Sequence, residues 1–462
     1  MTPAAAPWHL APQQPRARRR VAQAFVIGEI LCQLALLVPS LNVGGLRILW
    51  RIGVFGASLA LLALLPGKTR RSPTAIAAFW VIALLGIEIF HPTSNSWMAA
   101  IAETAMYVAI LAPVYWLPRL QISLPALRRV LLTLWSFYTI STVFGLLQVY
   151  YPGRFQPQLS PMVASMGDAI EGLKITLANG QRVFRPMGLT DMPGGAATAG
   201  MWALIFGLGL WLTTNTGRQQ YWLRAAFLAS MLGGMVCIYL SQARVMLVVS
   251  AVMFSMLLLT LFWRRRWRQF SQLGVLVLAV GLVGFYASVR LGGKQLSNRL
   301  ATVAGASKGS NTFTEERGVF LQQTIHDLIP EYPLGAGLGR WGMMNTYFGD
   351  NHDPRRGLIY VEIQWQGWVL DGGLPLVLGY LILLAVTMRS LARIARKRGP
   401  VWIWAAVCLA YDVAMIAFCF DYTPFTGEMG LDFWFINALV LTAAATLERQ
   451  MAAAPPPYGW PR

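Results

Sequence analysis

Apolar runs long enough to cross a lipid bilayer recur along almost the whole chain, and they constrain its fold more than any other feature. A helix needs roughly 20 predominantly apolar residues to span the hydrocarbon core of a membrane. These runs are too long and too continuously apolar for barrel strands, which alternate over about ten residues. The sequence predicts about twelve spanning helices, over residues 21–38, 46–65, 74–90, 97–117, 126–150, 195–213, 222–240, 245–263, 273–289, 361–388, 400–420 and 430–447.

The composition supports a membrane protein over a soluble one. Of the 462 residues, 56% are hydrophobic and 12% are charged, whereas soluble domains carry about 25% charged residues. We therefore expect an all-α, polytopic membrane protein with one transmembrane domain over 21–448, between a disordered N-terminus (1–20) and a disordered tail (449–462). The net charge of +19 would suggest nucleic acid for a soluble protein. Here the basic residues punctuate the spans, so we expect no nucleic-acid partner.

Basic residues are distributed unequally between the two predicted sides of the membrane. The short turns 91–96 and 421–429 on one side contain no Lys or Arg. The segments on the other side contain no Asp or Glu, and their basic residues are those of 16–20, Lys68, Arg70, Arg71, Arg119, Arg128, Arg129, Arg218, Arg224, Arg264, Arg265, Arg266, Arg268, Arg389, Arg393, Arg396, Lys397 and Arg398. This positive-inside pattern predicts that both termini are cytoplasmic. Arg47 and Arg51, near the outer end of the second span, are the main exceptions.

Two long segments, 151–194 and 290–360, fall on the predicted outer side, and the second is a large periplasmic loop between the ninth and tenth helices. Connections of this length are uncommon and often functional. Apolar residues recur at helical spacing over 313–328, so we expect a short helix on the membrane surface there. The glycine-rich segment 333–342 lacks the strand-then-helix setting of a nucleotide site. Its glycines instead indicate a tight loop or a close approach of the backbone to a ligand.

Several arginines lie on the predicted outer side, where topology disfavours positive charge. They are Arg185, Arg244, Arg317, Arg340, Arg355 and Arg356. The guanidinium fork matches phosphate oxygens, so two or three of them could bind a lipid-linked pyrophosphate. The alternative is that several pair with lipid headgroups or with acidic residues of the same loops, namely Asp191, Glu315, Glu316, Asp350 and Asp353. Arg244 is the strongest candidate because it stands in a tight turn between two spans.

Glu362 and His352 are the candidates for acid–base catalysis. Glu362 opens a span beside the large loop and could accept a proton from a sugar hydroxyl. His352 could serve the same role, since its free pKa is near neutral. Each has a structural alternative, because Glu362 could pair with Arg356 and the sequence around His352 is typical of a turn. Asp350, His352 and Asp353 are also spaced closely enough to ligate a cation, although we expect no metal.

Four acidic residues fall inside predicted spans, where ionisable groups are expensive. They are Glu29, Glu88, Glu103 and Asp412. They could form a proton pathway, which would favour a transporter, or make polar contacts between helices. The four cysteines also lie in apolar runs, without the spacing of metal ligands.

The order of these features resembles the O-antigen ligase/polymerase superfamily of bacterial inner membranes. The resemblance covers about 185–384 and depends on short motifs. These are the RPMGLTDMPGG segment at 185–195, the SQAR turn ending at Arg244, the ERGVF helix containing Arg317, the PLGAGLG segment at 333–339 and the Gly372-Gly373-Leu374 sequence. The ligases of this family place a histidine about eleven residues before the glycine pair. In this chain that position falls at Val361 and Glu362, and His352 is about nine residues too early.

The resemblance implies transfer of a glycan from an undecaprenyl-pyrophosphate-linked donor to a sugar hydroxyl, at the periplasmic face of the bacterial inner membrane. It fits a polymerase or ligase of exopolysaccharide or O-antigen biosynthesis, a glycosyltransferase that needs no metal or other cofactor. Arg244 and Arg317 would stabilise the pyrophosphate leaving group, with Arg185 and Arg340 as further ligands. His352 or Glu362 would take or orient the acceptor proton. Membrane lipids and other polysaccharide assembly or export proteins are the further partners that we expect.

Two other functions stay open at this point. A transporter or flippase of a lipid-linked or anionic glycan would explain the acidic residues inside the spans. Such proteins commonly carry paired half-repeats, and none is evident in this sequence. A non-catalytic assembly subunit would explain the large outer loops, but it would have no need of the outer arginines.

Overall fold

The computed structural model describes residues 20–67, 72–159, 163, 167–177, 180–214, 220–304, 317–350, 352–397 and 399–453, with only the backbone described at 167–169 and 291–304. Some of the basic residues that predict which side of the membrane each segment faces lie outside the described residues. The same is true of most residues in the two termini, which we expect to be disordered. It is also true of Glu315 and Glu316, which are among the acidic residues that could pair with outer arginines.

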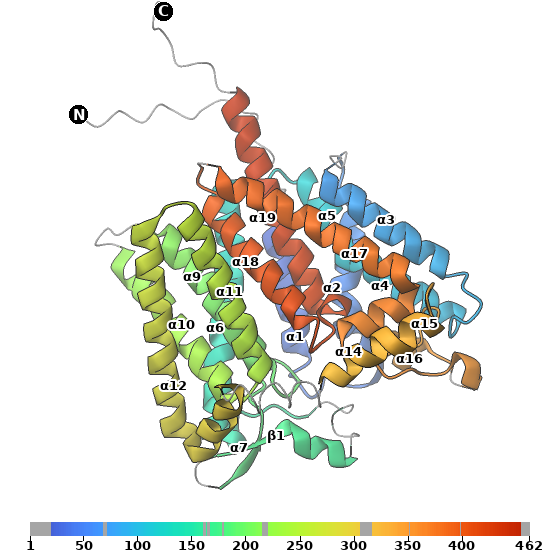
Figure 1. The fold of residues 1–462 in the computed structure, drawn as a ribbon, viewed down its shortest axis with the longest axis horizontal. Coiled ribbons are helices and arrows are strands. Elements are labelled where there is room, and N and C mark those ends of the chain that lie inside the picture. The colour runs from blue at the N-terminus through green and yellow to red at the C-terminus, as the bar shows by residue number, and fades with distance from the viewer. Residues whose placement is uncertain are drawn as a thin grey trace, which may run out of the picture.

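The described chain is mostly helical, and each of the predicted apolar runs corresponds to an apolar helix (Figure 1). The helices are α1 (Val21–Ala35), α2 (Gly44–Leu64), α3 (Pro73–Glu88), α4 (Trp97–Leu111) with α5 (Pro113–Trp116), α6 (Leu124–Tyr150), α9 (Gly195–Thr213), α10 (Tyr221–Leu240), α11 (Arg244–Trp263), α12 (Trp267–Ala304), α17 (Gln364–Arg396), α18 (Trp402–Phe418) and α19 (Glu428–Ala453).

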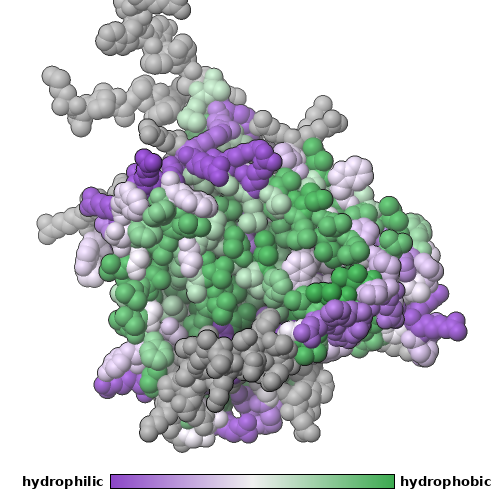
Figure 2. Space-filling model, viewed as in Figure 1, coloured by the Kyte–Doolittle hydropathy of each residue, from purple (hydrophilic) through white to green (hydrophobic). Residues whose placement is uncertain are grey.

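Within the described residues, eight helices are long and apolar enough to cross a membrane, or nine if the bent pair α4–α5 forms one span. The shorter apolar helices are α1, α3 and α18. Figure 2 shows a broad hydrophobic band across the visible face, with hydrophilic residues concentrated above and below it. The chain is therefore a multi-pass helical membrane protein, while the count of twelve spans and their orientation in the cell stay predictions.

The bundle has two distinct ends. At one end, which we call the basic face, Arg264 contacts the Ala395 carbonyl and the Trp402 ring, and Lys397 pairs with Glu448 at 2.7 Å. At the other end, which we call the loop face, lie the turns 91–96 and 419–427 and the described parts of the segments 151–194 and 333–360. Figure 1 shows four elements of these segments at this end, opposite the C-terminal end of α19: α7 (Pro152–Phe155), β1 (Lys174–Thr176), α14 (Val319–Gln323) and α16 (Gly342–Phe348).

The two long segments on the loop face are partly structured. In the large loop, α12 continues to Ala304, and residues 317–331 are helical, including α14 (Val319–Gln323), a π-helical turn (Thr324–Leu328) and α15 (Ile329–Glu331). This agrees with the helix predicted over 313–328, as far as those residues are described. After it come α16 (Gly342–Phe348) and a 3-10 turn at Pro354–Arg356.

The segment 151–194 contains a feature that the all-α prediction did not include. After α7 (Pro152–Phe155) and a 3-10 helix (Gly167–Leu173), an antiparallel hairpin pairs β1 (Lys174–Thr176) with β2 (Arg182–Phe184). Each strand is three residues long, which is shorter than the runs of about 4–8 residues that signal a strand in sequence. A small open sheet is compatible with a membrane protein here because it lies in a segment between spans.

Candidate functional site

A cavity of about 410 Å³ opens at the loop face, surrounded by α1, α2, α4, α6, α9 and α19. The segments 190–195, 341–344 and 422–427 complete its wall, so residues from both long loops and from the last turn meet there. We call it the loop-face cavity. Its polar lining residues include Gln33, Arg51, Glu103, Asp191, Glu428 and Asp432.

Arg51 is the only Lys or Arg among the described residues that line the loop-face cavity. Its guanidinium pairs with Asp191 at 2.5 Å, and Arg47 reaches the other Asp191 oxygen at 3.1 Å. The Asp191 side chain is 2% exposed, whereas that of Arg51 is 20% exposed. Two arginines therefore share one buried carboxylate, so the two positive charges of this cluster are only partly compensated by Asp191.

The Asp191 segment is held in place by the polar face of α6. Gln148 accepts hydrogen bonds from the backbone N–H groups of Met187 and Gly188, both at 2.8 Å. Gly188 has φ +66, and a Cβ there would lie 2.5 Å from Ser141 Oγ. Only glycine fits this combination of left-handed backbone and close contact. These contacts hold the segment 185–195, which resembles a motif of the superfamily, so that Asp191 lies against Arg51.

Carboxyl groups line the rest of the cavity. Asp432 accepts a hydrogen bond from the Tyr138 hydroxyl at 2.8 Å, and Glu428 accepts one from Gln33 at 3.2 Å. Glu103 accepts a hydrogen bond from the Gly339 N–H at 2.5 Å. Aromatic rings lie beside these groups, since Tyr138 stacks on Trp202 with centroids 5.6 Å apart. The carboxyl oxygens can accept hydrogen bonds from hydroxyl groups, and the adjacent aromatic rings can pack against an apolar surface. This combination suits a polyhydroxylated ligand with apolar faces, such as a sugar.

The glycine-rich segment 333–342 inserts between the α3–α4 turn and a kink in α17. At Gly335 an added Cβ would lie 3.0 Å from Gly372 Cα, and at Gly337 it would lie 2.5 Å from the Ser94 nitrogen. The Ala336 N–H donates to the Leu370 carbonyl at 2.7 Å. These glycines permit a close approach of two stretches of backbone, whereas the predicted approach of the backbone to a ligand stays a prediction. The contact is to other backbone, and it carries Trp341 to the cavity wall.

Trp341 is fixed there by a buried carboxylate. Its indole N–H donates to Asp371 Oδ1 at 2.6 Å, and the Tyr107 hydroxyl donates to Asp371 Oδ2 at 2.5 Å. Asp371 and Tyr107 are both fully buried. Gly367 leaves room for the indole, because a Cβ there would lie 2.5 Å from a ring carbon of Trp341. The wall of the cavity is therefore rigid at this point.

Replacing Tyr107 with Phe should lower the free energy of unfolding by about 1–3 kcal/mol, because Asp371 then keeps a buried oxygen without its donor. Thermal unfolding of the purified protein in detergent measures the change. Tyr150→Phe serves as the matched control, since Tyr150 is exposed. Equal unfolding temperatures for Tyr107→Phe and the unsubstituted protein would contradict this account of Trp341.

Arg317 and Glu362, two of the predicted site residues, form an ion pair beside the cavity. The Arg317 Nε also lies 3.4 Å from Asp421, which precedes the cavity-lining Tyr422. The start of α17 is tied to the same turn, because the Gln364 N–H donates to the Tyr422 carbonyl at 3.0 Å. The structure thus brings Arg317 and Glu362 together at the rim of the loop-face cavity. The alternative partner of Glu362, Arg356, pairs instead with Asp353.

Arg244 is the first residue of α11, directly after the Ser241–Ala243 turn. The contacts of Arg264 with Ala395 and Trp402 show that α11 runs antiparallel to its neighbour α18. The Arg244 end of α11 therefore lies at the loop face, where α18 ends before Asp421. Its buried Nε has no hydrogen-bond partner among the described residues. Arg244 does not line the loop-face cavity, so pyrophosphate binding by it stays a prediction.

Arg340 and Arg185 point to backbone groups. Arg340 is 6% exposed and donates to the carbonyls of Gly357 and Ala336, each at 3.3 Å. Arg185 follows β2 and donates to the Gly172 carbonyl at 3.1 Å. Neither lines the loop-face cavity. These contacts stabilise the two loop segments, and pyrophosphate binding by either residue stays a prediction.

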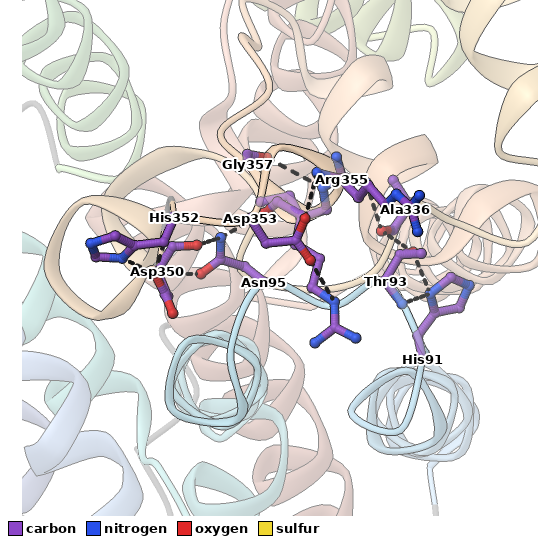
Figure 3. A network of polar contacts seen from close by, with 11 residues as sticks. His91, Thr93, Asn95, Ala336, Asp350, His352, Asp353, Arg355 and Gly357 are labelled. Atoms are coloured by element: carbon purple, nitrogen blue, oxygen red, sulfur yellow. Dashed lines mark hydrogen bonds and ion pairs between the residues drawn. The ribbon is translucent and has the colours of Figure 1, made fainter.

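His352 lies at one edge of a polar network that docks the segment 350–357 on the α3–α4 turn (Figure 3). Asn95 is the centre of this network, donating to the carbonyls of Asp350 and Arg356 at 2.8 and 2.7 Å. The His352 side chain is 98% exposed and bonds Asp350 at 2.5 Å. That bond, followed by one from the His352 N–H, lowers the pKa of Asp350. His352 does not line the cavity, so a catalytic role for it stays a prediction.

No group of three or more His, Cys, Asp or Glu side chains placed to hold a metal ion occurs within the described residues. Asp350, His352 and Asp353, which the sequence left open as a cation site, form the turn described above.

Sequence reasoning missed several residues of the loop-face cavity. Arg51 had a visible signal, because it was an exception to the positive-inside pattern. Glu428 and Asp432 had a weaker one, since two acidic residues one helical turn apart begin an apolar helix. Gln33 and Tyr138 had none, because single polar residues inside spans commonly make contacts between helices.

No protein-family model matches this chain, and no curated protein matches it at a significant level. The resemblance to the O-antigen ligase/polymerase superfamily therefore stays a hypothesis based on short motifs and their order.

Proposed function

We propose that this protein transfers a glycan from an undecaprenyl-pyrophosphate-linked donor to a sugar hydroxyl, as a polysaccharide polymerase or O-antigen ligase does. One observation carries the proposal. A cavity lined by carboxyl groups, aromatic rings and Arg51 adjoins the Arg317–Glu362 pair at the headgroup end of a membrane bundle. The cavity suits a sugar acceptor, and the arginines at its rim suit the pyrophosphate of a lipid-anchored donor.

The proposed reaction is a displacement at the anomeric carbon of the donor sugar. A new C–O bond forms to the acceptor oxygen, and the bond between the sugar and the pyrophosphate oxygen breaks. The acceptor proton passes to a carboxylate, and of the two predicted acid–base candidates, Glu362 and His352, Glu362 lies nearer the cavity. Arg317 and Arg244 stabilise the negative charge that develops on the pyrophosphate, and such contacts contribute roughly 10²–10³-fold to a rate. No step requires a metal, because the leaving group is already a stabilised anion.

We propose that the loop face is periplasmic. The basic face carries Arg119, Arg264 and Lys397, so the positive-inside pattern turns that face to the cytoplasm. The loop face then faces the periplasm, where a lipid-linked donor presents its glycan. The bacterial inner membrane is the compartment that fits, with membrane lipids and other polysaccharide assembly or export proteins as neighbours.

Arg317→Ala and Arg244→Lys test the role of the arginines. We expect both to reduce glycan transfer strongly, and Arg244→Lys to do so because an ammonium cannot reproduce the bidentate fork. Product chain length in cells carrying each variant, normalised to the amount of protein in the membrane, is the measurement. Arg182→Ala is the control, since Arg182 is exposed on the β-hairpin and pairs with Glu171. Full activity of both site variants at normal membrane levels would rule out this mechanism.

A further inference from the structure

Among the described residues, four carboxyl groups line the loop-face cavity, namely those of Glu103, Asp191, Glu428 and Asp432. All but Glu428 belong to residues that are 2–3% exposed. Each of these three already accepts a hydrogen bond or an ion pair from the protein, as described above. Glu428 is half-buried. A carboxyl group that reacts with a bound sugar must be reachable from the cavity, so Glu428 is the best placed of the four.

Glu428 is the first residue of α19, and the turn before it is fixed by packing. The Phe425 N–H donates to Gln364 Oε1 at 2.9 Å, and the Phe425 ring is fully buried. Gly430 brings the first turn of α19 against this segment, because a Cβ there would lie 2.9 Å from the Phe425 backbone. The backbone that carries Glu428 is therefore held in place, and the positive end of the helix dipole faces its carboxylate.

Only one of the two Glu428 oxygens is engaged by the protein. The Gln33 amide, from α1, donates to Glu428 Oε2 at 3.2 Å. No described residue donates a hydrogen bond to Oε1. An ionised carboxylate can accept several hydrogen bonds on its two oxygens. Gln33 therefore orients the group and leaves Oε1 to accept a hydrogen bond from a hydroxyl group in the cavity.

Glu362, the acid–base candidate identified from the sequence, is placed differently. It does not line the loop-face cavity. Its Oε2 pairs with Arg317, which we propose to stabilise the pyrophosphate. A proton taken up by Glu362 would remove the negative charge of that pair in the middle of the reaction. Glu362 is thus better suited to hold Arg317 in position than to accept a proton.

We propose that Glu428 is the catalytic base that takes the proton of the acceptor hydroxyl, an inference that rests on the proposed glycan transfer. The acceptor O–H bond breaks as its proton moves to Glu428 Oε1, and the acceptor oxygen bonds to the anomeric carbon of the donor sugar. The bond from that carbon to the pyrophosphate oxygen breaks, and its electron pair leaves with the pyrophosphate. Glu428 then returns its proton to water in the cavity.

The charged groups around Glu428 are compatible with this role. Those that interact with it electrostatically are Glu29 and Cys32 of α1, Arg51 of α2, Asp191, Tyr422 and Asp432. Arg51 is the single cation of this set, and it forms its ion pair with Asp191 at 2.5 Å. Within the described part of the chain, Glu428 therefore has no arginine of its own, in contrast to Glu362.

Glu428→Gln tests the proposal. Purified full-length protein is added to membranes from cells lacking it, which supply the lipid-linked donor and the acceptor, and product formation is measured as a function of pH. We expect kcat to fall by about 10²-fold, the lower end for loss of a general base, because other carboxyl groups remain in the cavity. KM should change little. The residual rate should lack the fall at low pH that protonation of the base causes.

Three further variants separate a chemical role from a structural one. Glu428→Asp keeps a carboxylate and should recover part of the rate together with its fall at low pH. Gln33→Leu leaves the carboxylate in place, so it should lower kcat and keep the fall at low pH. Glu171→Gln changes an exposed carboxylate on the loop segment and should match the unsubstituted protein. Size-exclusion profiles in detergent establish that each variant is folded.

Glu362→Gln separates the two candidate bases. It disturbs the pair with Arg317, so we expect a lower rate that still falls at low pH. If Glu362→Gln lost that fall and Glu428→Gln kept it, or if folded Glu428→Gln kept the full kcat, the role of Glu428 would be overturned and glycan transfer would stand. If the unsubstituted protein formed no product in these membranes, glycan transfer would be rejected, and the role of Glu428 with it.

Discussion

Arg51→Ala should cause the largest loss of glycan transfer of any single substitution on the wall of the loop-face cavity. Arg51 is the only Lys or Arg among the described lining residues, and it pairs with the buried Asp191. Removing one partner of such a pair leaves an incompletely compensated charge. When both partners are fully buried, this lowers the free energy of unfolding by roughly 3–5 kcal/mol. We expect a smaller cost here, because Arg47 still contacts Asp191 and Arg51 is partly exposed.

Activity and stability must be measured together for this substitution. We expect a fall in transfer of roughly 10²–10³-fold, as for the loss of one charge-stabilising donor, and a modest fall in the unfolding temperature. Arg51→Lys is the matched variant, because it keeps the charge and loses the fork. If Arg51→Ala transferred glycan at the unsubstituted rate, the loop-face cavity would not be the reaction site.

Gly373→Ala should prevent the accumulation of folded protein. Gly373 has φ +60 and ψ −156 at the kink of α17, and a Cβ there would lie 2.2 Å from the Pro333 carbonyl oxygen. A non-glycine residue in this left-handed backbone conformation lowers the free energy of unfolding by roughly 1–3 kcal/mol. The clash with the Pro333 carbonyl oxygen adds to this, because it is a clash with backbone and no side-chain movement can relieve it. Because the Leu374 N–H donates to that same carbonyl at 2.9 Å, the docking of the glycine-rich segment is lost as well.

Membrane levels and size-exclusion profiles in detergent measure the effect. Gly86→Ala in α3 is the control, since nothing lies within 4 Å of a Cβ at that position. Alanine there should be neutral or stabilising, because it is the better helix former. A monodisperse, normally expressed Gly373→Ala protein would show that the kink does not depend on glycine.

The helical elements were largely predictable because bilayer length and hydrophobicity determine them locally. Each predicted run corresponds to a helix, and the run 97–117 bends where Pro113 begins α5. The short strands at 174–176 and 182–184 were not predictable, since three residues are too few for an alternating pattern to be recognised. In the loop 290–360 the sequence predicted one short helix over 313–328, whereas the described residues also contain the extension of α12 and α16.

The candidate site was predictable only in part. Arg317 and Glu362 were identified separately by their charge on the outer side, but their pairing joins residues 45 positions apart and depends on how the large loop folds back. Arg51 and Asp191 are 140 positions apart, and only Arg51 violated a topological rule. Glu103 was identified as an acidic residue inside a span. Its hydrogen bond from the Gly339 N–H depends on how the segment 333–342 packs in the fold. The sequence indicated only that this segment is rich in glycine.

Analysis of the lipid-linked glycans in cells lacking this protein tests the proposed function most directly. We predict that undecaprenyl-pyrophosphate-linked glycans accumulate at the periplasmic face. Single repeat units without long chains would identify a polymerase, and long chains still attached to the lipid would identify a ligase. Accumulation of the units at the cytoplasmic face would contradict glycan transfer and indicate a transporter.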